Sequence, residues 1–142
     1  MTKNLAEIMY EVRDAGSPEE QAKILKKYNN VPLFYLLKLS FSSNYEKLEK
    51  EPEYKVDDSP IGFTYASLTK SYRSVPTFLT KAATPALKKK QERKFINFLE
   101  SLHWTESALL LNMLMKRVEQ TYNLSFETLK TYFPGEFKDV RH

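Results

Sequence analysis

The segment Ala108-Leu109-Leu110-Leu111-Asn112-Met113-Leu114-Met115 contains seven apolar residues out of eight. A helix built from it is apolar on every side, and such a helix is stable only when it is buried on every side. The segment is too short to cross a bilayer, which takes roughly 20 apolar residues. We therefore expect a buried central helix over roughly residues 106–118, with Thr105 as its N-cap, in a compact all-α domain.

The composition of the chain limits its class. It has 142 residues, no cysteine, three glycines and a net charge of +4. This length corresponds to one domain, and the lack of cysteine excludes disulfides, thiolate metal sites and cysteine nucleophiles. No apolar signal-peptide core follows Met1, so we expect a soluble protein of the cytoplasm (the host cytoplasm if the protein is viral) without membrane contact. The mildly positive charge is compatible with a polyanionic partner but does not demand one.

Apolar spacing predicts about seven helices in a single domain, residues 1–142. The domain divides into a helical unit over residues 1–41, a long loop over residues 42–64 and a second helical unit over residues 65–137. The loop lacks periodicity, and its acidic side chains are interpreted as solvated charge and not as a calcium site. The expected helices cover residues 3–14, 17–28, 33–41, 66–80, 84–102, 106–118 and 125–133.

Capping residues mark several of these boundaries. Ser17 and Glu20 have the spacing of a capping box, and Gly16 is expected to end the first helix in a left-handed conformation. Thr84 precedes Pro85, the preferred arrangement of an N-cap and a first-turn proline.

Side chains of the usual catalytic sites are scarce. His103 and His142 have no second ligand or acid partner nearby in the sequence, and we interpret His103 as a structural residue between two helices. No glycine-rich phosphate loop is present. The sequence therefore predicts a binding protein with no enzymatic activity, no catalytic residue, no cofactor and no metal site.

Positive charge is concentrated in Lys88-Lys89-Lys90-Gln91-Glu92-Arg93-Lys94, where five of seven residues are basic. They lie in the first half of the long helix, where positive charge interacts slightly unfavourably with the helix dipole. Two interpretations are open: a helix that contacts nucleic-acid phosphates, or a solvated surface that keeps the protein soluble. The residues alone favour the solvated surface.

Both ends of the chain resemble the N-terminal DNA-binding domain of ATP-dependent DNA ligases, especially those of large tailed phages. The resemblance rests on Leu5-Ala6-Glu7-Ile8, on SPEEQAKIL from Ser17, on LLKLSF from Leu36 and on LSFETLKTYFPG from Leu124. Small free-standing phage proteins that share the opening and the LESLH segment from Leu99 are also similar. The K-x-D-G motif with the adenylated lysine of ligases is absent. The R-D-x-x-x-G turn of ligases corresponds to Arg117 to Asn123, with one residue added and asparagine in place of glycine.

In ligases this domain is all-helical and grips duplex DNA through the minor groove, by backbone and shape. The resemblance therefore implies a non-enzymatic phage protein that binds double-stranded DNA independently of its sequence and acts in replication, repair or recombination. The residues expected to contact phosphates are Lys88, Lys89, Lys90, Arg93, Lys94, Lys116 and Arg117. The alternative is an adapter that binds a host or phage replication or transcription protein through the 42–64 loop, and does not bind DNA.

Overall fold

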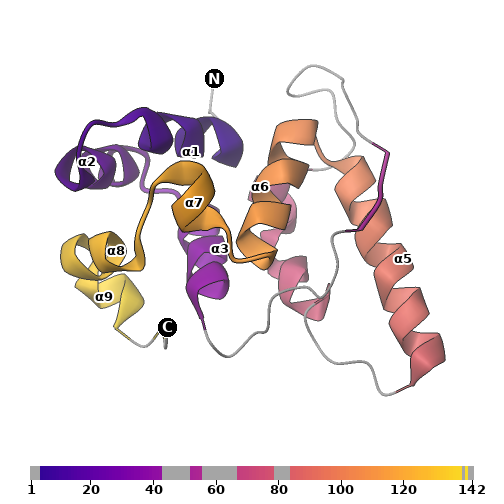
Figure 1. Cartoon of the computed structure of the whole chain (residues 1–142). Coiled ribbons are helices and arrows are strands. Elements are labelled where there is room, and N and C mark those ends of the chain that lie inside the picture. Colours follow the sequence, from indigo (N-terminus) through magenta and orange to yellow (C-terminus); the bar gives the residue numbers. More distant parts are fainter. Residues whose placement is uncertain (1–3, 43–51, 56–66, 79–83, 139, 141–142) are drawn as a thin grey trace.

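The computed structural model describes residues 4–42, 52–55, 67–78, 84–138 and 140. Within these residues every regular element is helical, which confirms the all-α class. The elements are α1 (Leu5–Asp14), α2 (Pro18–Tyr28), α3 (Val31–Phe41), α4 (Leu68–Ser71), the 3-10 helix η1 (Tyr72–Phe78), α5 (Pro85–Ser101), α6 (Trp104–Leu114), α7 (Val118–Tyr122), α8 (Phe126–Tyr132) and α9 (Pro134–Phe137). Helix α6 lies between α1 and α3 on one side and α5 on the other (Figure 1).

Helix α6 is buried around most of its circumference, as its composition predicts. It contacts α1, α3, α5 and α7, and its buried apolar side chains are Leu109, Leu110, Leu111, Met113 and Leu114. The predicted N-cap was wrong by two residues. His103 caps the helix, because its Nδ1 accepts a hydrogen bond from Thr105 N at 3.2 Å. The helix also ends at Leu114, four residues before the predicted boundary.

The caps predicted for α2 and α5 are confirmed. The Ser17 hydroxyl accepts from Glu20 N, and the Thr84 hydroxyl accepts from Leu87 N. The capping box at Ser17 is incomplete, however, because the Glu20 carboxylate accepts from Gly16 N and not from Ser17 N. A complete capping box opens α1 instead: Glu7 N donates to the Asn4 side chain at 2.8 Å, and Asn4 N donates to the Glu7 carboxylate at 3.1 Å.

The C-caps of α1, α2 and α7 differ in backbone conformation: the cap of α1 is extended, and those of α2 and α7 are left-handed. Helix α1 ends at Asp14, and its C-cap residue Ala15 has an extended backbone, so the left-handed cap predicted at Gly16 does not form. Asparagine is the C-cap residue of α2 and α7. Asn29 and Asn123 have left-handed backbones, with φ values of 43° and 56°. Asparagine is among the few residues that tolerate this region.

The described residues contain more helices than the seven that the sequence predicts, and the additional ones are short. The helix expected over residues 66–80 is α4 followed by η1, which contains Pro76. Proline has no N–H for an α-helical hydrogen bond, and this favours the change to 3-10 geometry. Helices α7 and α9 were not predicted. Pro134, expected to end the last helix, occupies the first turn of α9.

A buried carboxylate joins α6 to α4. Glu106 is 3% exposed, and its Oε2 accepts a hydrogen bond of 2.7 Å from Leu68 N, the first amide of α4. The N-cap of α4, Ser67, makes no side-chain cap bond, so Glu106 satisfies an amide at the start of this helix. Burial raises the pKa of Glu106, and the hydrogen bond from Leu68 offsets this effect only in part.

Truncation of α6 tests its central position. We expect Leu110→Ala to lower the free energy of unfolding by about 2–5 kcal/mol, because it leaves a cavity between α6 and its neighbours. Leu87→Ala is the matched control, because Leu87 is 50% exposed and its loss should change stability by less than about 0.5 kcal/mol. Urea unfolding followed by circular dichroism measures both. Equal losses in the two variants would contradict the buried position of α6.

Glu106 gives the protein a pH-dependent stability. Because its pKa is raised in the folded state, its neutral form stabilises the fold below the unfolded pKa, and this contribution is lost as the pH rises through the folded pKa. Glu106→Gln keeps an acceptor for Leu68 N and removes the charge. Its stability relative to the natural protein should therefore increase as the pH is raised from about 4.5 to 8. A constant difference in urea midpoints over this range would contradict the assignment.

Candidate nucleic-acid interface

Helix α5 has two different halves. Its C-terminal half, from Phe95, is packed against the protein, and we call residues 84–94 the free half because all of their side chains except that of Gln91 are exposed. In the C-terminal half, Phe95 and Leu99 are buried, and Leu99 O accepts a hydrogen bond of 2.6 Å from the Ser107 hydroxyl of α6. The Phe78 ring of η1 lies 5.1 Å from the Phe95 ring, measured between centroids. Lys55 N donates to the Glu100 carboxylate at 2.7 Å. Three segments therefore hold this half of the helix in place.

The N-terminal half of α5 projects from the rest of the protein (Figure 1). Every residue from Thr84 to Lys90 is exposed, and so are Glu92, Arg93 and Lys94. Gln91 is half-buried and connects this half to η1, because its side-chain amide donates to Thr77 O at 2.7 Å. The sequence signal for the division is the change from lysines to aromatic and aliphatic residues at Phe95.

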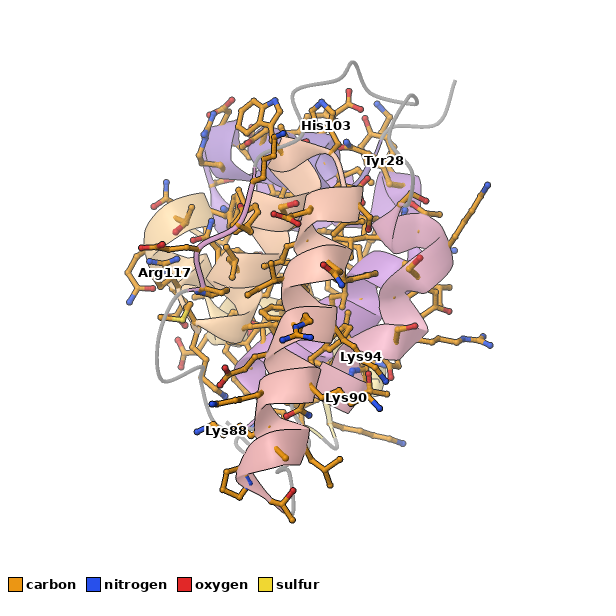
Figure 2. All side chains as sticks on the ribbon, turned by 90° about the vertical axis from the view of Figure 1, so that its right-hand side faces the viewer. Tyr28, Lys88, Lys90, Lys94, His103 and Arg117 are labelled. Atoms are coloured by element: carbon orange, nitrogen blue, oxygen red, sulfur yellow. The ribbon has the colours of Figure 1, made fainter. Side chains whose placement is uncertain are left out.

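Most of the predicted phosphate contacts share the outer face of α5. At about 100° per residue, Phe95 and Leu99 define the direction of the protein interior. Four cationic side chains point into the opposite half of the circumference: Lys89, Lys90, Arg93 and Lys94. Lys88 is exposed too, but it lies on the same side of the helix as Phe95 and Leu99. Figure 2 shows Lys88 on one side of α5, and Lys90 and Lys94 on the other.

The charges of this outer face are not neutralised by the described part of the chain. Among the described residues, no carboxylate lies within 4 Å of the cationic groups of Lys89, Lys90, Arg93 or Lys94. Of the acidic residues in the predicted 42–64 loop, only Glu53 belongs to the described residues. It is exposed, in a segment that contacts the packed half of α5 at Glu100. The other acidic residues of this loop lie outside the described residues.

The two remaining predicted contacts lie elsewhere, at the junction of α6 and α7. Lys116 is half-buried, and its Nζ donates a hydrogen bond of 2.6 Å to Ser42 O at the end of α3. Burial lowers the pKa of Lys116. Arg117 is the N-cap residue of α7 and lies away from the labelled lysines of α5 in Figure 2. The structure therefore brings four of the seven predicted residues onto one surface and separates Lys116 and Arg117 from it.

Lys116 has a structural role that its position in sequence did not reveal. Helix α6 ends in a Schellman motif, in which Arg117 N donates to Asn112 O at 2.7 Å and Lys116 N donates to Met113 O at 3.1 Å. The left-handed residue of this motif is usually glycine, but here it is Lys116 with φ 56°. The bond from its ammonium group to the end of α3 offsets the cost of that conformation.

His103 is the structural residue that the sequence predicts. It is 6% exposed, and its Nδ1 lies 2.6 Å from the Thr105 hydroxyl, besides accepting the amide bond that caps α6. Within the described residues, no group of three or more acidic or histidine side chains is arranged to hold a metal ion. In the same part of the chain, no helix has the length and apolar composition to span a membrane.

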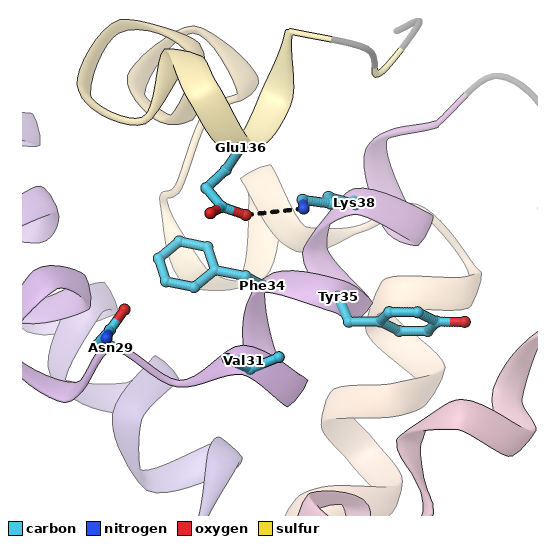
Figure 3. A pocket seen from close by; sticks show the side chains of 6 residues that line it. All are labelled: Asn29, Val31, Phe34, Tyr35, Lys38 and Glu136. Carbon is cyan, nitrogen blue, oxygen red and sulfur yellow. Dashed lines mark hydrogen bonds and ion pairs between the residues drawn. The ribbon is translucent and has the colours of Figure 1, made fainter.

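A shallow pocket between α3 and α9 was not predicted from the sequence. Its walls include Phe34, Tyr35 and the exposed side chain of Val31, and one edge is an ion pair of 2.8 Å between Lys38 and Glu136 (Figure 3). The pocket is small, about 120 Å³, and its one charged pair is already neutralised. It offers no set of groups for catalysis. The aromatic residues that line it could have been noticed as a surface cluster only with the positions of α3 and α9 known.

The fold and the free half of α5 define an all-helical protein with a projecting basic helix. Residues 8–120 match the model of a family of unknown function (DUF6433), and the chain belongs to this family. The match extends from α1 into α7 and includes the whole of α5. No curated protein has a sequence that matches this chain.

Substitutions of Lys116 distinguish a structural lysine from a surface contact. Lys116→Met removes the bond to Ser42 O but keeps the strained backbone, so we expect a loss of about 1–3 kcal/mol in the free energy of unfolding. Lys116→Gly removes the same bond and relieves the backbone, which should recover about 1 kcal/mol. The predicted order of stability is natural protein, then Gly, then Met. A Gly variant more stable than the natural protein in urea unfolding would contradict this role.

Proposed function

We propose that the protein binds double-stranded DNA independently of its sequence, through the outer face of the free half of α5, without enzymatic activity. The observation that carries this proposal is the set of four exposed cations on one face: Lys89, Lys90, Arg93 and Lys94. The resemblance to the DNA-binding domain of ATP-dependent ligases supports duplex DNA as the polyanion. It also supports a role in the replication, repair or recombination of phage DNA.

These four charges have no role in the fold that the described contacts show. Lys89 and Lys90 lie in the second turn of α5 and Arg93 and Lys94 in the third, so the helix dipole opposes them only weakly, because its effect falls off within the first turn. In the described part of the chain they form no ion pair that would offset this effect. Contacts with phosphates supply the missing negative charge and release the counterions that are condensed on DNA. Because phosphates are the same at every base pair, such contacts carry no sequence information.

The test is a fluorescence-anisotropy titration with duplexes of several sequences at a series of salt concentrations. We expect the affinity to be independent of sequence and to fall steeply with salt. Replacement of Lys89, Lys90, Arg93 and Lys94 by glutamine should reduce the slope of log K against log salt by about 3–4, since each phosphate contact contributes about 0.9.

A second quadruple variant controls for net charge. It replaces Lys23, Lys27, Lys130 and Lys138 by glutamine, four exposed lysines on or next to α2, α8 and α9, which lie across the molecule from α5 (Figure 1). This variant loses the same total charge and should keep most of the salt dependence. No binding to duplex DNA at low salt would overturn the proposal and favour the adapter, as would equal loss of binding in the two quadruple variants.

A further inference from the structure

The free half of α5 has the dimensions of a helix that can enter a groove of DNA. Residues 84–94 make about three turns and extend over about 16 Å, and all but Gln91 are exposed. A helix with its side chains is about 10–12 Å wide. The major groove of B-form DNA is about 12 Å wide and 8.5 Å deep, whereas the minor groove is only about 6 Å wide. This half of α5 therefore fits the major groove and is too wide for the minor groove.

The first turns of α5 are also exposed on the side that faces the protein interior further along the helix. Lys88 lies on the same side of α5 as the buried Phe95 and Leu99, yet it is exposed, because the body of the protein ends before it. A helix whose inner side is packed can still lie in the major groove with its outer face, as recognition helices do. The exposed inner side at Lys88 lets the first turns of α5 extend beyond the body, which reaches the helix at Gln91 through the contact with η1.

The four cations of the outer face form two rows. Lys89 and Arg93 are four residues apart and lie one above the other on one flank, and Lys90 and Lys94 form the same pair on the other flank. The two rows are about 100° apart around the helix. Between them, on the centre line of the outer face, lie the short side chain of Ala86 and, about three turns on, the exposed Asn97.

We propose that the free half of α5 inserts into the major groove of duplex DNA, with Lys89 and Arg93 on one phosphate backbone and Lys90 and Lys94 on the other. This assignment rests on the proposed function and specifies the groove. It differs from the resemblance to ligases, which implies minor-groove contact. The long cationic side chains lie on the flanks, where the two backbones border the groove. Ala86 faces the groove floor and offers no hydrogen bond to a base, which agrees with binding that ignores sequence.

Blocking one groove at a time tests the assignment. The natural protein is titrated by anisotropy against an A·T-rich duplex with and without netropsin, which occupies the minor groove. It is then titrated against a duplex whose cytosines are replaced by glucosylated 5-hydroxymethylcytosine, which fills the major groove with sugar. We expect netropsin to change Kd by less than about twofold, and glucosylation to raise Kd by about tenfold or more, since the helix needs the full groove width.

Variants of each row complete the test. Lys89→Gln with Arg93→Gln, and Lys90→Gln with Lys94→Gln, should each lower the salt slope by about 2, because each row contacts one backbone. Lys130→Gln with Lys138→Gln is the matched control and should leave the slope nearly unchanged. Circular dichroism confirms that each variant is folded.

The outcomes separate this assignment from the proposed function. Absence of binding to the unmodified duplex overturns both. Binding that netropsin displaces, or that survives glucosylation, overturns the major-groove assignment and leaves DNA binding in place. A loss of slope confined to one of the two rows overturns the two-backbone arrangement as well.

Discussion

Burial of α6 on all sides is the constraint on which the other elements depend. Its leucines require apolar partners in every direction, so α1 and α3 cover one side and the packed half of α5 covers the other. The polar side chains of its first turns become fixed connections in this setting. The Glu106 carboxylate accepts a hydrogen bond from the first amide of α4, and the Ser107 hydroxyl donates one to a backbone carbonyl of α5. A single buried helix thus determines where its neighbours begin and how closely they approach.

The division of α5 follows from the same constraint. Only the part of α5 that lies against α6 and η1 contributes to the core, through Phe95, Phe98 and Leu99. In the preceding three turns every side chain except that of Gln91 is exposed. Their composition is therefore free to serve a partner, and it is dominated by lysine and arginine. The packed half acts as a rigid base that holds the free half in one direction, which reduces the entropy lost when a partner binds.

The parts of the structure that depend on local chemistry were predictable from the sequence. Apolar spacing located the long helices, and N-caps such as Ser17 and Thr84 placed their starts, because a hydroxyl bonds an amide only three residues away. Contacts between distant residues were not predictable. Lys116 appeared to belong with the basic cluster, but its ammonium group bonds Ser42, 74 residues earlier. The role of Glu106 was missed for the same reason. The seven residues predicted to contact phosphates also do not share one surface, because Lys116 and Arg117 lie at the α6–α7 junction.

Helix α5 has a packed half that supports the fold and, as we propose, a free half that contacts DNA. The most direct measurement is an NMR titration of the 15N-labelled protein with a short duplex, following the backbone amide shifts. We expect the largest shifts in residues 84–97, with much smaller ones in α1, α2, α8 and α9. Shifts concentrated on α8 and α9, or at Lys116 and Arg117 with α5 unaffected, would contradict this expectation.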